Sequence, residues 1–246
     1  KTNNLKLKED KKKDMFGKAS AGVGTNDRYE GRFNVNSFKG ARQFSAIGMA
    51  NNTNAEGFSF MDLMNFTGEL NRMRQSGSGN ASSTVTDDDP IAAMTGNGNG
   101  NGIKTIWGGG INYNNIIGSK TDFNGSYFYN RYNPHQESVT QRQYFLLDSS
   151  YFYNQNSVSD NLNNSHRLNL VADIQIDSFH SVKISSSASY QETRNSVYNS
   201  YETLSDEMQL ANQGFSSNNS TGQGSNFRND ILFRKKFPRK GRTLSL

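Results

Sequence analysis

Apolar or small residues alternate with polar residues through long stretches of this chain, and this period of two limits the fold more than any other feature. Successive side chains of a β-strand point to opposite faces, so the alternation predicts strands whose two faces meet different surroundings. The clearest run covers residues 167–176, where Leu168, Leu170 and Ile174 fall on one face and Arg167 on the other. Similar runs predict an all-β, antiparallel up-and-down meander of about nine strands, most of about 10–12 residues, at 15–24, 29–39, 42–51, 107–114, 122–129, 167–176, 182–191, 227–237 and from 242 onward.

The expected connections between these strands alternate in length. Tight turns are expected at 40–41, 118–119, 177–180 and 238–241, whereas the connections at 52–102, 133–165 and 195–224 are much longer and only 25–28 is short. Every second connection of an antiparallel meander lies at the same end of the sheet, so one rim would carry tight turns and the other long loops. This asymmetry, with strands long enough to cross a bilayer at a tilt, is typical of outer-membrane β-barrels.

The two predicted faces differ so strongly that they need different environments. One face carries apolar and aromatic side chains, which we expect to meet lipid: Phe33, Trp107, Ile111, Tyr127, Tyr129, Leu168, Leu170, Ile174, Val182, Ile184, Tyr190 and Phe233. The other carries charged and amide side chains, which we expect to line a lumen: Arg32, Asn34, Asp122, Asn124, Arg167, Asp173, Lys183, Arg228 and Asp230. Aromatic residues near strand ends are expected to form two interfacial girdles: Phe16, Tyr29, Trp107, Tyr113, Tyr129, Tyr190, Phe227 and Phe237.

The composition decides what can cover the apolar face. Only 33% of the residues are hydrophobic, which is low for a domain with a two-layer core. Only residues 59–73 look helical, and one short helix in a long loop cannot cover nine long strands. Hydrocarbon is therefore the expected cover. Ordinary cross-strand packing in a soluble β-sheet binding module or a non-transporting surface or adhesion β-protein is the alternative.

Motifs that carry chemistry are sparse. The chain has no Cys, and its three His residues are too scattered for the usual zinc spacing. The run from Asp87 to Asp89 could supply carboxylates to a calcium ion, although such a run is more often simply solvated. Residues 118–121 lack the upstream glycine of a phosphate-binding loop, and we expect a turn there. The sequence thus indicates neither an enzyme nor a cofactor.

Basic clusters at 11–13, 234–236 and 239–242 raise the alternative of a nucleic-acid-binding sheet. These clusters fall at the expected rim of tight turns and not across an aromatic face. Lys and Arg beside lipid headgroups are therefore the expected role, and nucleic acid is not an expected partner.

Several short stretches resemble TonB-dependent receptors, and most closely the subgroup described as outer-membrane β-barrel proteins. Residues 4–10, 16–17 and 27–31 are similar to a plug-to-barrel junction, and further likeness lies at 36–40, 48–52, 57–62, 166–170 and 227–230. The resemblance implies that residues 1–10 end a plug domain and that 11–246 form a partial barrel in the outer membrane of a Gram-negative bacterium. The missing plug and the remaining strands would belong to the same protein.

The same resemblance implies an activity. Such receptors import a scarce solute, for example a metal chelate, a cofactor or a glycan, and an inner-membrane energy-coupling complex acts on the plug. The partners expected for this chain are therefore outer-membrane lipid, that complex and an unidentified solute. About nine strands with two open edges cannot close a pore, so we expect this chain to be a piece of a larger barrel.

Overall fold

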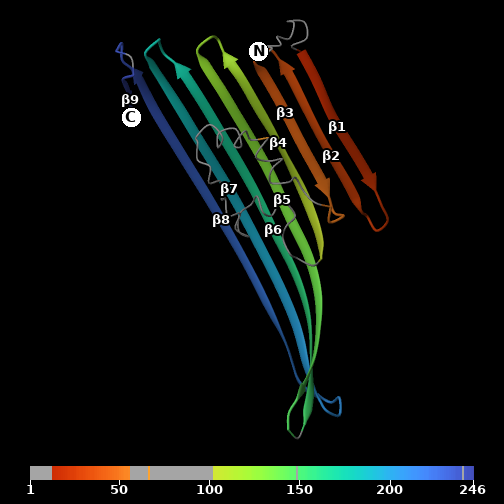
Figure 1. Ribbon diagram of the computed structural model, residues 1–246. Helices are drawn as coiled ribbons and strands as arrows, with labels where there is room; N and C mark the ends of the chain where they lie inside the picture. Colours follow the sequence, from red (N-terminus) through yellow and green to blue (C-terminus); the bar gives the residue numbers. More distant parts are fainter. Residues whose placement is uncertain (1–12, 56–65, 67–101, 148, 240) are drawn as a thin grey trace, which may run out of the picture.

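The computed structural model describes residues 13–55, 66, 102–147, 149–239 and 241–246. These residues form one antiparallel sheet in which each strand pairs with the next one in the sequence (Figure 1). The nine strands are β1 (Lys13–Val23), β2 (Tyr29–Lys39), β3 (Arg42–Asn51), β4 (Ile103–Ile117), β5 (Thr121–Phe145), β6 (Ser150–Gln175), β7 (His180–Ser205), β8 (Leu210–Lys236) and β9 (Thr243–Ser245). The antiparallel meander predicted from the alternation is confirmed.

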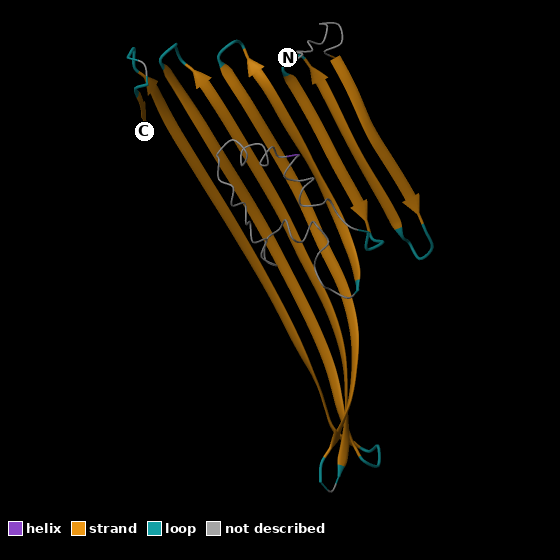
Figure 2. Ribbon diagram, viewed as in Figure 1, coloured by secondary structure: helices purple, strands orange, loops and turns teal. Residues whose placement is uncertain are grey.

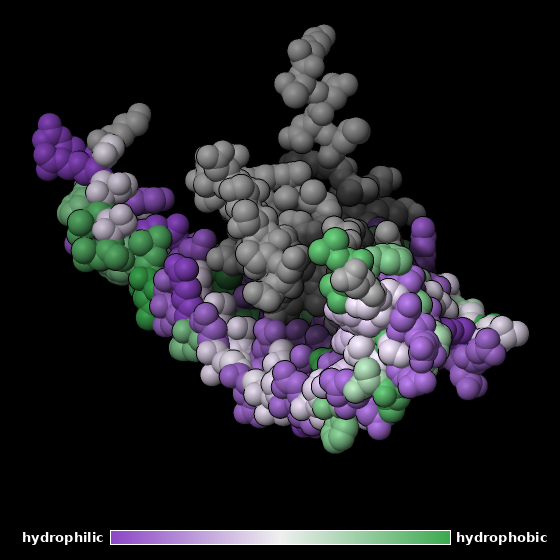
Figure 3. Space-filling model, turned by 90° about the horizontal axis from the view of Figure 1, so that it is seen from below, coloured by the Kyte–Doolittle hydropathy of each residue, from purple (hydrophilic) through white to green (hydrophobic). Residues whose placement is uncertain are grey.

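The sheet is open in the described part of the chain. There, β1 pairs only with β2 and β9 only with β8, so each leaves one edge without a partner strand. Seen from below, the sheet curves like a trough (Figure 3). This shape is consistent with part of a barrel, although the described residues do not close one. Among them, none belongs to a helix long and apolar enough to cross a membrane.

Strand length is where the prediction was partly wrong. The first three strands have 10 or 11 residues as expected, but β5–β8 have 25 to 27 residues. The segments 133–165 and 195–224, predicted as long loops, instead extend β5–β6 and β7–β8 into tall hairpins. Figure 2 shows loops only at the strand ends, and β5–β8 twist about one another beyond the rest of the sheet. Their side chains are polar on both faces, so hydrophobic alternation carried no signal there.

The rim of tight turns is confirmed. The turns after β2 and β4 contain Gly40 and Gly118, whose φ angles of 61° and 64° suit glycine. After β6, the backbone N–H groups of Phe179 and His180 donate to Asp177 Oδ1 at 2.7 and 2.8 Å. Asp is common in turns because its carboxylate accepts hydrogen bonds from nearby backbone N–H groups in this way. The opposite rim is uneven, because the two tall hairpins rise from it.

The strand register decides which residues share a face, because residues directly opposite each other in an antiparallel pair point to the same side. We call the side that carries Leu168 the apolar face and the side that carries Arg167 the polar face. One row across the apolar face runs through Phe33, Gly48, Gly109, Tyr129, His166, Tyr190 and Ser225. The register is continuous over most of the sheet, with one irregularity between Thr203 and Leu204.

Burial falls almost entirely on one side of the sheet. Of the buried residues in the described chain, only Gly48 lies on the apolar face, where the ring of Phe33 contacts it. The others lie on the polar face: Met49, Asn51, Ile106, Gly110, Asn112, Ser126, Phe128, Asn130 and Ser165. Phe128 packs against Ile47 and Phe66, and the carbonyl oxygen of Phe66 accepts a hydrogen bond from Asn112 Nδ2 at 2.6 Å. This burial therefore surrounds the place where Phe66 packs on the polar face.

Candidate functional site

The register places the residues predicted to meet lipid on one face and those predicted to line a lumen on the other. The first set is Phe33, Trp107, Ile111, Tyr127, Tyr129, Leu168, Leu170, Ile174, Val182, Ile184, Tyr190 and Phe233. The second set is Arg32, Asn34, Asp122, Asn124, Arg167, Asp173, Lys183, Arg228 and Asp230. Residues that alternate within one strand thus form two continuous surfaces across many strands.

The apolar face is uncovered. Trp107 is 51% exposed, Ile111 is 50% exposed and Leu168 is 38% exposed, although all three are large hydrophobic side chains. On the described strands β4–β8, this face carries no Asp, Glu, Lys or Arg between the row of Tyr129 and the row of Val182. An apolar surface of this extent, exposed and without charge, is typical of an interaction surface.

The apolar surface has a definite height. It extends from His166 on β6 to Ile176, the residue that follows the end of this strand. This stretch of about ten residues is about 33 Å long at about 3.3 Å per residue. At the tilt of about 40° usual for membrane barrels, this length spans about 25 Å, the height of a typical lipid-facing band.

An aromatic row marks one border of the apolar surface. The ring of His166 lies between Tyr129, at 4.9 Å between ring centres, and Tyr190, at 6.3 Å. Its Nδ1 also shares a hydrogen bond of 2.7 Å with the hydroxyl of Tyr127. Sequence reasoning treated His166 as an isolated histidine. Its place on the same face as Leu168 was the available signal, but only the register shows it between two tyrosines.

Further aromatic residues at this border come from the first strands. Trp107 Nε1 donates a hydrogen bond of 2.9 Å to the hydroxyl of Tyr29, and the two rings meet edge to face. The expected girdle is otherwise only partly correct. Phe16 lies on the polar face, where it stacks on Phe38, and Tyr113 and Phe227 lie within the apolar surface.

Charged side chains return to this side of the sheet just beyond the aromatic row. His135 hydrogen-bonds through Nδ1 to Asp160 at 2.7 Å and through Nε2 to Glu137 at 3.3 Å. These bonds, with Asp160 the larger cause, raise the pKa of His135 above its ordinary value of 6.5. On β7, Arg194 pairs with Glu192 at 2.7 Å. The apolar surface therefore ends within a few residues of the aromatic row.

The polar face opposite the apolar surface is lined by ion pairs and amides. Both carboxylate oxygens of Asp173 accept hydrogen bonds from Arg234 Nη2, at 2.7 and 2.6 Å, across the intervening strand β7. Arg228 pairs with Asp230 at 2.8 Å. The amide of Asn51 is fully buried and finds no hydrogen-bond partner among the described residues. A buried unpaired amide is costly.

In the tall hairpins, the continuation of the polar face carries tyrosines and very little charge. Tyr144 stacks on Tyr151 at 4.7 Å, and Tyr153 stacks on Tyr201 at 6.2 Å. Between the rows of Tyr144 and Gln136, Arg142 is the only charged residue on this side of the described hairpins. This surface offers rings, amides and hydroxyls to whatever approaches it.

Comparison with known proteins does not assign a family, since neither the protein-family models nor the curated sequences include a match to this chain.

Residues 118–120 form the turn after β4, as expected. The run from Asp87 to Asp89, which we expect to be solvated more often than to bind calcium, lies outside the described residues. The expected plug residues 1–10 also lie outside them, as does the predicted helix at 59–73 apart from Phe66. Within the described ranges, no three His, Cys, Asp or Glu side chains are grouped to hold a metal ion.

Proposed function

We propose that this chain forms part of an outer-membrane β-barrel, and that the barrel is a transporter resembling TonB-dependent receptors. The supporting observation is the exposed apolar face: it is about 25 Å high at a normal barrel tilt, bounded by aromatic side chains and followed by charged ones. Water would not stabilise such a surface, whereas a bilayer would. Location in the outer membrane of a Gram-negative bacterium follows from this assignment.

The polar face lines the lumen in this proposal. Membrane strands must pair all their backbone groups, so the open edges of β1 and β9 require further strands, which complete the barrel. The plug lies against the polar face, and an inner-membrane energy-coupling complex acts on that plug. The tall hairpins extend outward, so that their tyrosine-bearing side contacts the incoming solute, be it a metal chelate, a cofactor or a glycan.

The absence of Cys from the sequence makes a direct test possible. Single Leu170→Cys and Asn169→Cys variants of the full-length protein are labelled with an environment-sensitive fluorophore in lipid vesicles. These neighbours lie on opposite faces of β6. We expect a blue-shifted emission, quenched by spin-labelled lipid, only for the label at position 170. Equal quenching at both positions, or quenching at 169 alone, would contradict the proposal.

A non-transporting surface protein is the second candidate, because the tall hairpins place a large area of sheet beyond the apolar surface. The two candidates differ in their need for energy. Uptake through an energised receptor stops when a protonophore collapses the inner-membrane potential, whereas adhesion to a surface continues. If cells that express the protein adhere equally well before and after protonophore treatment, and show no uptake that the treatment stops, the surface protein is favoured.

A further inference from the structure

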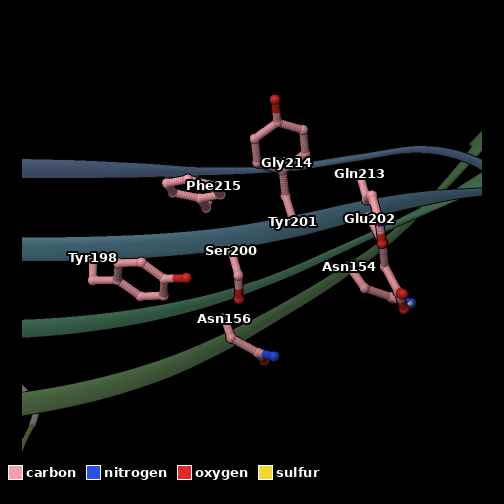
Figure 4. A pocket seen from close by; sticks show the side chains of 9 residues that line it. All are labelled: Asn154, Asn156, Tyr198, Ser200, Tyr201, Glu202, Gln213, Gly214 and Phe215. Carbon is pink, nitrogen blue, oxygen red and sulfur yellow. Dashed lines mark hydrogen bonds between the residues drawn. The ribbon is translucent and has the colours of Figure 1, made fainter.

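A groove lies on the tall hairpins, on the continuation of the apolar face. The tyrosine-bearing side, which the transport proposal assigns to the solute, is the opposite face of the same hairpins. The groove measures about 530 Å³ and is formed by β6, β7 and β8. Figure 4 shows its lining: Tyr198 and Phe215 form one part, and Glu202, Asn154 and Gln213 lie toward the hairpin tips. All of these residues continue the apolar face by register, whereas the ring of Tyr201 projects from the opposite side.

The aromatic part of the groove offers an exposed platform. The rings of Tyr198 and Phe215 are stacked, with their centres 6.3 Å apart and their planes 24° from parallel. Tyr198 is 46% exposed and Phe215 is 73% exposed. In a proposed membrane protein these rings cannot serve as lipid anchors, because Tyr198 is about 26 Å along β7 from the aromatic row at Tyr190. Charged residues such as Arg194 lie between them.

The remaining wall of the groove is polar and planar. Asn154 Nδ2 donates to Glu202 Oε1 at 3.0 Å, which orients the carboxylate and leaves its other oxygen for a ligand. Asn156 and Ser200 lie directly opposite each other in the next row, and Gln213 lies opposite Glu202. The hydrogen bond between Asn154 and Glu202 holds these two side chains in place before a ligand arrives, which reduces the entropy lost on binding.

This chemistry selects a class of ligand. Sugars present a C–H face that packs on an aromatic ring and adjacent hydroxyl groups that pair with amides and carboxylates. Phosphate or sulfate groups would need cations, and the described lining of the groove contains no Lys, Arg or His. One carboxylate does not make a metal site, and the many amides would be left unpaired by a purely apolar ligand. The groove is not enclosed, and its volume of about 530 Å³ is large enough for more than one sugar unit.

We propose that this groove binds an uncharged oligosaccharide at the cell surface. The site is separate from the solute path of the transport proposal and does not depend on transport. Two sources of the sugar share this chemistry: the polysaccharide of lipopolysaccharide in the surrounding leaflet, and free polysaccharide from outside. The position of the groove, beyond the charged residues that follow the aromatic row, is within reach of both.

The test measures binding of three probes to the full-length protein in nanodiscs: smooth lipopolysaccharide, rough lipopolysaccharide that lacks the polysaccharide chain, and the free delipidated polysaccharide. All come from the organism that carries the chain. The variant Tyr198→Ala/Phe215→Ala removes the platform. Phe145→Ala is its control, because it removes an exposed aromatic ring from the same face of the tall hairpins but outside the groove lining. Glu202→Gln keeps the shape of the groove and removes its charge.

We expect the double variant to weaken binding of polysaccharide-bearing probes at least about tenfold, and Phe145→Ala to change it less than about twofold. Binding of smooth lipopolysaccharide alone identifies the leaflet as the source, and binding of free polysaccharide identifies the exterior. Salt-sensitive binding that is lost in Glu202→Gln would instead show a cationic ligand and overturn the proposal. Equal binding by the double variant, or binding to none of the probes, would also overturn it. Heat-modifiable gel mobility confirms that each variant is folded.

Discussion

Replacing Leu170 by Arg tests the central physical argument. Leu170 lies on the apolar face of β6, with its side chain across Gly125. It is about four residues from His166 and six from Ile176, or about 13 and 20 Å along the strand. At a tilt of about 40° these distances become about 10 and 15 Å, so the proposed barrel would have Leu170 near the middle of the bilayer.

An Arg side chain at the midplane of a barrel costs about 2–4 kcal/mol of folding free energy. On a water-exposed sheet, the same substitution would cost no more than about 0.5 kcal/mol. The matched control is Asn169→Arg, which places the same charge one residue away on the polar face. The assay is urea-dependent folding of the full-length protein into lipid vesicles at equilibrium. We expect a loss of at least about 2 kcal/mol for Leu170→Arg and less than about 1 kcal/mol for Asn169→Arg. Equal losses, or the larger loss for Asn169→Arg, would refute the reasoning.

Three further predictions concern individual contacts. A histidine NMR titration should show the pKa of His135 above 6.5 and, in Asp160→Asn, a return toward that value. The contact between His135 and Asp160 should stabilise the hairpin fully below about pH 6.5 and lose this effect as the pH rises through the raised pKa. A carboxyl NMR titration of Asp177 should give a pKa of about 2, because the backbone N–H of Phe179 and the side chain of His180 favour the carboxylate. The contribution of Asp177 to stability should be present above pH 3.8 and disappear as the pH falls through about 2. A titration near 3.8 would show that the turn is open. Gly110→Ala should lower the free energy of unfolding in vesicles by about 1–3 kcal/mol, because its Cβ would lie 2.6 Å from Phe128 and 2.9 Å from Phe66. Gly48→Ala should cost much less, because the ring of Phe33 that its Cβ would meet can turn away from the sheet. Equal costs would show that the ring of Phe33 is confined too.

The apolar segments of the strands were predictable because their signal is local. In β6, Leu168, Leu170 and Ile174 alternate with Arg167 and Asp173, and this pattern alone assigns each residue to a face. The tight turns after β2 and β4 were equally visible, since glycine stands where a positive φ is required. A pattern of this kind is contained in a few neighbouring residues and needs no knowledge of the rest of the fold.

The tall hairpins were not predictable in the same way. Segments 133–165 and 195–224 are strands in which Ser, Asn, Gln and Tyr occupy both faces, so hydrophobicity does not alternate. Their extended state depends on pairing with the neighbouring strand, and the sequence of one strand does not show whether its neighbour continues. The groove between Tyr198, Phe215 and Glu202 exists only as a consequence of that pairing.

By itself the sequence determined the strand type, the two faces of the apolar segments and the position of the tight turns. Only the tertiary structure decided which residues of different strands form a row: His166 between Tyr129 and Tyr190, and Asp173 with Arg234. The reason is physical, because alternation is a property of one strand, whereas a row depends on the register between strands. A shift of one residue in register would move a whole strand's side chains to the other face.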